Sequence, residues 1–320
     1  MIELSVIVPT RGPSPELRDQ LRSLDESIPP GAPVEVIVAV DGPDALTGEL
    51  EGLTIRPTVL TLGETSGAAT ARNRGAAMAR ADVLAFLDDD VIVAVGWFAD
   101  VRRRMAEDWD LLGGRLGSVQ QNNLVSQMFE TLVIRHGRVD GRWFLASANL
   151  LVRRPAFTAL GGFDERYPGA GGEDWDLCRR AHLQGLTVVA VEDCAVHHRN
   201  PTRLRSLTSR ARTYAASTSV RFADDRPRIT GSEEGVVELA GRVRGGRGPG
   251  LQGIVTALSN YLGRFAEIRR HGIGRVRAAV ILVLHMPWFL TYALASLAVL
   301  RREHAARPST PSQHAGRSAA

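Results

Sequence analysis

The chain of 320 residues is 44% hydrophobic, which allows one large domain or two ordinary ones with a substantial core. Its two cysteines are too few for a disulfide framework and suggest a reducing compartment. The net charge of +4 hides a division: residues 1–198 hold 19 Arg against 28 acidic residues, residues 199–320 hold 20 Arg against 7, and Lys is absent. A basic C-terminal third suits an anionic membrane or a diphosphate ligand. No recognisable nucleic-acid-binding module accompanies it, so no nucleic-acid partner is expected.

The first 200 residues alternate apolar runs with helical patterns. Strands are predicted at 4–10, 34–40, 59–62, 83–87, 143–152 and 186–191. Helices are predicted at 17–24, where Leu recurs at spacings of four and three, at 67–80, which is rich in Ala, and from 173 onward. This alternation, with strands that look buried, is typical of an α/β fold with a mostly parallel sheet flanked by helices.

Three consecutive carboxylates, Asp88–Asp90, follow the fourth predicted strand. Buried carboxylates are costly to ionise without a partner, so a divalent cation shared by Asp88 and Asp90 would explain them. A solvated acidic turn is the alternative. Thr10 and Asp41 also follow strands, and parallel sheets bind their ligands beyond the carboxyl ends of the strands. This convergence favours a ligand site over the solvated turn.

No GxxxxGK[ST] motif occurs and no GxGxxG motif follows the first strand, so a nucleotide would have to be bound through metal and arginine. Arg72 lies in a helix opened by Gly67, a position suited to a diphosphate, although it could equally be an ordinary surface residue. Asp41 either caps the turn at 42–43 or accepts hydrogen bonds from a nucleobase, and its spacing favours the turn.

A glycine-rich stretch at 169–172 precedes a helix whose first turn holds three carboxylates, among them Glu173 and Asp174. Capping and the helix dipole account for one or two of these acids. The glycines fit a loop that closes over substrate, and a carboxylate at this helix start is a candidate general base. Farther along, His197 and His198 would point to opposite faces of a strand, so only one of them can point at a metal.

The order of these motifs resembles the inverting family 2 glycosyltransferases, which have the GT-A fold. The motifs that carry the resemblance are SVIVPT, VIVAVDG, ATARNRG, FLDDDV, ASANLLVRR, GGFDERY, GGEDWDLCRRAHLQG and the histidine pair, all within residues 1–200. Each motif alone has low specificity, whereas the ordered set is strong. The motif Q-x-x-R-W of processive members is absent, so transfer of one or a few sugars is expected.

The resemblance implies a nucleoside-diphosphate sugar donor and a divalent metal, Mg²⁺ or Mn²⁺, that bridges its phosphates. The residues that it assigns to donor binding are Pro9, Thr10, Asp41, Arg72, Asp88 and Asp89. Thr10 and Asp41 would flank the base and ribose, and Arg72 would lie near the base or the diphosphate.

The resemblance also assigns the metal ligands and the catalytic residues. Asp90, in the D-x-D motif, would bind the metal directly, and His198 or His197 would complete the metal site. Asp174 would be the catalytic base, with Glu173 beside it. Asp89 has no separate role in this scheme, because it is expected to face away, and its loss should matter least.

The C-terminal third has a different character. The expected division is a GT-A catalytic domain at 1–222, a linker or loop at 223–250, helices at 251–304 and a disordered tail at 305–320. Residues 251–268 have amphipathic spacing, and residues 278–300 form an uncharged stretch long enough to span a bilayer. A buried or interfacial hairpin packed on the catalytic domain is the alternative.

The arginines on the N-terminal side of 278–300 would keep the catalytic domain at the cytoplasmic face of the cell membrane. A glycan or lipid-linked acceptor, such as a cell-envelope glycan, is therefore expected. Two other functions stay open: a sugar nucleotidyltransferase, which would release pyrophosphate, and a non-catalytic membrane protein that binds nucleotide sugars.

Overall fold

The computed structural model describes residues 2–46, 48–119, 123–132, 136–139, 141–167, 169, 171–217, 269 and 274–306. Its main sheet has the strand order β11-β6-β10-β4-β1-β2-β3. The strands are β1 (Leu4–Thr10), β2 (Val34–Val40), β3 (Thr58–Thr61), β4 (Val83–Leu87), β6 (Leu111–Gly113), β10 (Asn149–Arg153) and β11 (Val188–Ala190). Strand β10 runs antiparallel to β4 and β6, and the other neighbours pair in parallel. The predicted α/β fold with a mostly parallel sheet is confirmed.

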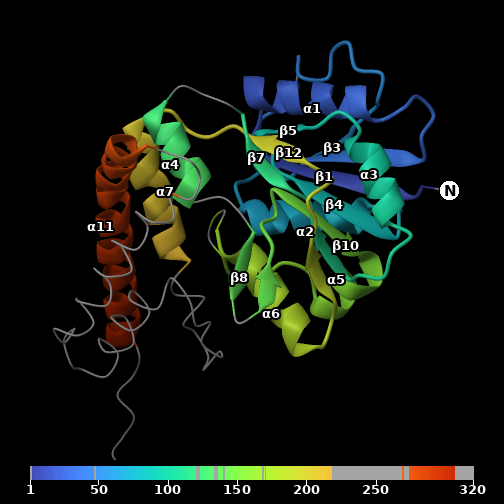
Figure 1. Cartoon of the computed structure of the whole chain (residues 1–320). Coiled ribbons are helices and arrows are strands. Elements are labelled where there is room, and N and C mark those ends of the chain that lie inside the picture. The colour runs from blue at the N-terminus through green and yellow to red at the C-terminus, as the bar shows by residue number, and fades with distance from the viewer. Residues whose placement is uncertain are drawn as a thin grey trace, which may run out of the picture.

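Helices cover both faces of this sheet (Figure 1). The helices α1 (Pro15–Ser27) and α3 (Trp97–Arg104) lie on one face, and α2 (Ala68–Met78), α5 (Arg154–Leu160) and α6 (Glu173–Leu183) lie on the other. Strand β1 is buried along its whole length, because Val6 and Val8 point toward α1 while Ile7 points toward α2. Helix α1 begins where the Ser14 hydroxyl accepts the Leu17 N–H at 3.0 Å.

Helix α2 packs unusually close to the sheet at Gly75. A Cβ atom at this position would lie 2.6 Å from Cγ2 of Ile7 on β1. The missing side chain therefore lets α2, the helix that also carries Arg72, approach the strand closely.

A small second sheet extends the carboxyl edge of the main one. It consists of β5 (Val91–Val93), β12 (Val196–His198) and β7 (Leu116–Ser118), in the order β5-β12-β7. Because β12 pairs with β5 in antiparallel register, His198 lies opposite Val91, the residue after the acidic triplet. A short hairpin is formed by β8 (Gly137–Val139) and β9 (Arg142–Phe144).

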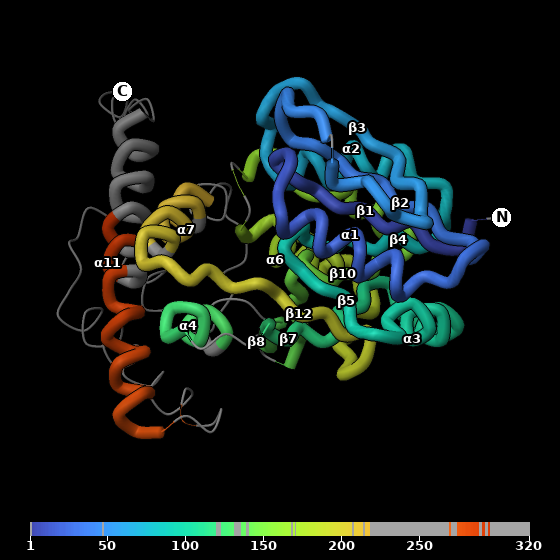
Figure 2. Tube along the Cα trace, turned by 90° about the horizontal axis from the view of Figure 1, so that it is seen from above, coloured from blue at the N-terminus to red at the C-terminus, as the bar shows by residue number. Residues whose placement is uncertain are grey.

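Three helices form a separate group beside the sheet: α4 (Leu124–Leu132), α7 (Leu204–Ala216) and α11 (Arg275–Ala306) (Figures 1 and 2). Helix α11 packs against both α7 and α4. Its Ala278 and Ile281 are fully buried in an apolar cluster with three α4 residues, Val125, Met128 and Phe129. A segment from the middle of the chain and the C-terminal helix thus share one core.

The prediction that residues 278–300 insert into a membrane is not supported. No helix in the described part of the chain is long and apolar enough to cross a bilayer. Residues 278–300 lie within α11, which rests on α4 and α7 and contains Pro287. The predicted linker at 223–250, the amphipathic segment 251–268 and the tail from 307 onward lie outside the described residues.

Candidate active site

The acidic triplet and β12 bring three possible metal ligands together. Asp88, Asp90 and His198 each offer one ligand atom, and these atoms all lie within 4.8 Å of one another. The Nε2 atom of His198 lies 3.0 Å from Oδ1 of Asp90, and the imidazole is buried. Because neighbouring strand residues point to opposite faces, His197 points away from this group. We call Asp88, Asp90 and His198 the acidic triad.

The chemistry of the acidic triad fits a divalent cation. Burial alone would raise the pKa of Asp90, but His198 and Arg210 lower it overall. Burial likewise opposes the charge of His198, whose pKa is nevertheless raised by Asp90. Two carboxylates and an imidazole nitrogen are suitable ligands for a cation such as Mn²⁺, and carboxylates alone suit Mg²⁺.

The side chain of Asp89 lies beside Thr10 at the end of β1. We expected this side chain to face away from the site; it is half-buried and has a hydrogen bond with the Thr10 hydroxyl. Burial, with the charges of Asp90 and Asp88 as lesser causes, raises its pKa to about 6. Thr10 also closes a tight turn, because its hydroxyl donates to the Gly12 carbonyl at 3.0 Å. Pro9 is buried in β1 beside Ala39 of β2.

Arg72 joins the acidic triad to the start of α6. Its guanidinium is 2% exposed, lies 2.6 Å from Asp88 and 2.8 Å from Glu173, and stands over the Phe163 ring at 5.6 Å. Burial disfavours its charge, but the two carboxylates raise its pKa overall. The alternative of an ordinary surface arginine is therefore wrong for Arg72, whereas Arg74 on the same helix is exposed.

The two acids at the start of α6 have different environments. Glu173 is 1% exposed and accepts the Gly171 N–H at 2.6 Å. Burial and the neighbouring Asp174 raise the pKa of Glu173 to about 7, against the opposing effect of Arg72. Asp174 is only partly buried. Its Oδ2 accepts the Ser147 N–H at 3.0 Å. Asp174 is therefore the member of the pair that a substrate can reach.

The backbone before α6 favours this arrangement. Gly172 caps the helix with φ 101°, a conformation that residues with a side chain rarely adopt. The glycine-rich stretch thus turns the chain so that the first residue of α6 points to Arg72 and the second to Ser147.

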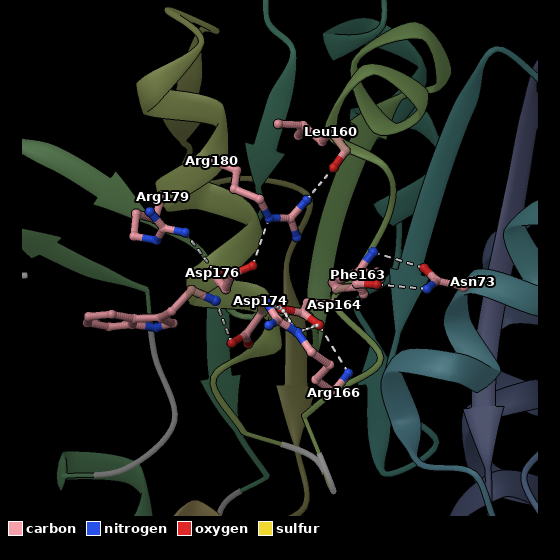
Figure 3. A network of polar contacts seen from close by, with 10 residues as sticks. Asn73, Leu160, Phe163, Asp164, Arg166, Asp174, Asp176, Arg179 and Arg180 are labelled. Atoms are coloured by element: carbon pink, nitrogen blue, oxygen red, sulfur yellow. Dashed lines mark hydrogen bonds and ion pairs between the residues drawn. The ribbon is translucent and has the colours of Figure 1, made fainter. Parts of the chain in front are cut away.

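A polar network holds the loop between α5 and α6 (Figure 3). The Asn73 amide donates to the Phe163 carbonyl at 2.8 Å and accepts the Phe163 N–H at 2.9 Å. Asp176 pairs with Arg180 at 2.7 Å, and Arg180 also donates to the Leu160 carbonyl at 2.5 Å. The ATARNRG motif therefore does two things: Arg72 enters the site, and Asn73 fixes the GGFDERY loop beside it.

Asp41 does not cap the turn at 42–43, the arrangement that its spacing favoured. Its carboxylate accepts the backbone N–H groups of Ser66 at 2.6 Å and of Gly67 at 3.1 Å. It therefore orders the chain just before α2, and the carboxylate is 5% exposed. A contact between Asp41 and a nucleobase stays a prediction.

Sequence reasoning missed two residues that shape the site. Asn149, fully buried at the start of β10, donates to the Cys194 carbonyl at 2.8 Å and so holds the approach to β12. Arg210 of α7 lies 3.6 Å from Asp90. The only signal for Arg210 in the sequence is the high arginine content of residues 199–320, which does not distinguish one arginine from another.

Comparison with known families settles the membership of the chain. The model described as Glycosyl transferase family group 2 matches residues 83–302, and the model described as Glycosyl transferase family 2 matches residues 5–159. The chain belongs to the family 2 glycosyltransferases. The resemblance drawn from the ordered motifs is thereby confirmed.

Individual relatives of this family 2 glycosyltransferase are more distant. A pre-mycofactocin glycosyltransferase of Mycobacterium tuberculosis is 28% identical over 240 residues, which cover 69% of this chain and 48% of the relative. The chain thus matches about half the length of that protein. The structure of the mannosyltransferase PcManGT from Pyrobaculum calidifontis, in complex with GDP-Man and Mn²⁺, is similar to this one, with a TM-score of 0.54 and 16% sequence identity. The matched region covers 95% of this chain and 87% of the PcManGT chain. This likeness supports the GT-A-like fold.

Proposed function

We propose that this family 2 glycosyltransferase transfers a sugar from a nucleoside-diphosphate donor to an acceptor hydroxyl, with a divalent cation and with inversion at the anomeric carbon. One observation carries the proposal: Arg72 bridges Asp88 of the acidic triad and Glu173, the neighbour of Asp174. The buried Arg72 side chain thereby connects the acidic triad, which would hold the cation that neutralises a diphosphate, to the start of α6, where Asp174 can accept a proton.

The donor half consists of the acidic triad. Asp88, Asp90 and His198 would hold the cation, and the cation would offset the charge that develops on the departing diphosphate. Arg72 holds the Asp88 side chain in place by its 2.6 Å contact. Mg²⁺ and Mn²⁺ both suit these ligands, and Mn²⁺ accompanies GDP-Man in the PcManGT structure.

The acceptor half consists of Asp174. Its carboxylate is held by the Ser147 and Trp175 N–H groups at 3.0 and 2.8 Å, which fix its orientation and leave lone pairs available. The acceptor O–H would give its proton to Asp174 while its oxygen bonds to the anomeric carbon and the bond to the diphosphate breaks. A single displacement of this kind inverts the anomeric centre. Glu173 is too buried to take part and positions Arg72 instead.

The donor and acceptor are proposed only as classes. UDP, GDP and dTDP sugars all suit a site built from metal and arginine, and the absence of Q-x-x-R-W favours transfer of one or a few sugars. A glycan or lipid-linked hydroxyl is one candidate acceptor. Pre-mycofactocin is a second, supported by the name of the M. tuberculosis relative. Location at the cytoplasmic membrane face stays a prediction.

Product analysis tests the proposal. Wild-type protein incubated with nucleotide sugars, Mn²⁺ and candidate acceptors should release a nucleoside diphosphate, whereas a nucleotidyltransferase would release pyrophosphate and a non-catalytic binder neither. Asp174→Asn should lower transfer at least about 100-fold, the scale of a lost general base, and keep metal-dependent donor binding. Asp108→Asn, the same change at an exposed aspartate, is the control. Normal turnover by Asp174→Asn would refute the assignment of the base.

A further inference from the structure

Arg210 brings a positive charge from the helical group to the acidic triad. It lies on α7, and its Nη2 atom is 3.6 Å from Oδ2 of Asp90. The guanidinium stands over the ring of Phe129, a buried α4 residue, with 5.5 Å between its central carbon and the ring centroid. Phe129 belongs to the apolar cluster that α4 shares with α11, so this platform is part of a packed core.

Arg210 differs from Arg72 in how firmly it is held. Arg72 is 2% exposed and makes charged hydrogen bonds of 2.6 and 2.8 Å to two carboxylates. The side chain of Arg210 is 35% exposed, and its 3.6 Å separation from Asp90 is longer than a hydrogen bond. Asp90 also has a closer partner, His198, at 3.0 Å. The contact with Asp90 therefore leaves the donors of Arg210 available for another anion.

The surroundings of Arg210 suit a phosphate. A guanidinium has a planar fork of donors that matches phosphate oxygens. Because the Phe129 ring already restricts the orientation of the Arg210 guanidinium, less conformational entropy is lost when a phosphate binds. Phosphates held by a cation at Asp90 would lie within reach of a guanidinium that already contacts the same carboxylate. The two arginines contact different carboxylates of the acidic triad, Arg72 at Asp88 and Arg210 at Asp90.

We propose that Arg210 is a diphosphate-binding residue that changes partner: it pairs with Asp90 when the donor site is empty and binds the donor diphosphate once a cation is held by the acidic triad. This inference rests on the proposed function, because it places the donor diphosphate at Asp90. It adds a residue from α7 to the site and makes the α4–α7–α11 group a functional part of the enzyme.

The exchange predicts two effects of opposite sign. Arg210 and a divalent cation have like charges and compete for the same carboxylate, so Arg210 should weaken binding of the cation alone. When a diphosphate is present, Arg210 should strengthen its binding through charged hydrogen bonds. A purely structural residue would weaken both binding events when it is removed.

Titration calorimetry of the full chain can measure both effects. In Arg210→Gln we expect Mn²⁺ alone to bind a few-fold more tightly, and UDP or GDP at saturating Mn²⁺ to bind roughly tenfold more weakly, the scale of one lost charged hydrogen bond. Arg210→Lys keeps the positive charge but not the planar fork of donors. It should bind Mn²⁺ alone as weakly as wild type does, and it should recover only part of the nucleotide affinity that Arg210→Gln loses. Arg212→Gln, an exposed change on the same helix, is the control.

The outcomes separate this inference from the proposed function. Unchanged nucleotide affinity in Arg210→Gln, or a loss of both affinities, would overturn the role of Arg210 and leave the donor site standing. A wild-type protein that binds neither UDP nor GDP with Mn²⁺ would overturn both. Melting temperatures of all variants, measured without ligand, show whether a loss of affinity reflects unfolding.

Discussion

The substitution Arg72→Gln tests whether the buried bridge holds the two halves of the site together. It removes the only described cation in direct contact with Glu173 and one of the contacts of Asp88, while it keeps a similar volume and some hydrogen-bonding capacity. Breaking a buried ion pair by removing one partner costs about 3–5 kcal/mol, because a charge is left buried without compensation. Asp88 is 29% exposed and can recover water, so we expect about 3 kcal/mol at neutral pH.

The loss should depend on pH in a direction that the structure fixes. Burial already raises the pKa of Glu173 to about 7, and without Arg72 it should rise further. A raised carboxyl pKa means that the folded state holds a proton which the unfolded state has released, so stability falls as the pH rises through the folded pKa. The difference in the free energy of unfolding between wild type and Arg72→Gln should therefore be smallest near pH 6. Above pH 7 it should widen by at most about 1.4 kcal/mol per pH unit until the variant's own pKa is reached.

Urea unfolding at pH 6.0, 7.5 and 8.5 measures this gap directly. Arg74→Gln, a change on the exposed side of the same helix, controls for the loss of an arginine from α2. Arg72→Gln that matches Arg74→Gln within about 0.5 kcal/mol at every pH would refute the buried bridge, since surface substitutions typically stay within that range. A gap that narrows as the pH rises would refute the pKa argument for Glu173.

Three further predictions address packing and pH. Gly75→Ala should destabilise the protein by about 1–3 kcal/mol in urea unfolding because its Cβ would lie 2.6 Å from Ile7, and a neutral result would contradict the close packing of α2. His136, whose pKa burial lowers from its ordinary 6.5, should make stability fall as the pH drops below about 6.5, and thermal melts of His136→Gln should show a weaker fall. Ile281→Ala should cost about 2–5 kcal/mol, and an unchanged melting curve would argue against the packing of α11 on α4.

Much of the fold follows from local sequence patterns. The runs at 4–10, 34–40 and 83–87 coincide with β1, β2 and β4, because the main sheet is covered by helices on both faces and its central strands are apolar throughout. The single strand predicted at 143–152 is in fact two, β9 and β10. The interruption lies at Ser147, whose N–H is directed to Asp174 on α6 and not to a neighbouring strand.

Features that depend on distant partners were not predictable. The three-residue strands β5, β7 and β12 exist only because they pair with one another. The packing of α11 on α4 was not foreseen either, because no helix was predicted at 124–132.

The candidate site shows the same limit. Residue type and spacing indicated Asp88, Asp90 and Asp174, and strand alternation predicted that only one histidine points inward. The joint burial of Arg72 and Glu173, the placement of Asp89 near Thr10 and the approach of Arg210 to Asp90 all depend on contacts across the fold.

The central claim is that the acidic triad holds the cation through which a donor diphosphate binds. Calorimetry of UDP and GDP binding, with and without Mn²⁺, tests it most directly in wild type, Asp90→Ala, His198→Ala and His197→Ala. Wild type and His197→Ala should bind a nucleoside diphosphate in a manner that depends on Mn²⁺, because His197 points away from the triad. Asp90→Ala and His198→Ala should lose that dependence, and an unchanged response to Mn²⁺ in Asp90→Ala would contradict the account.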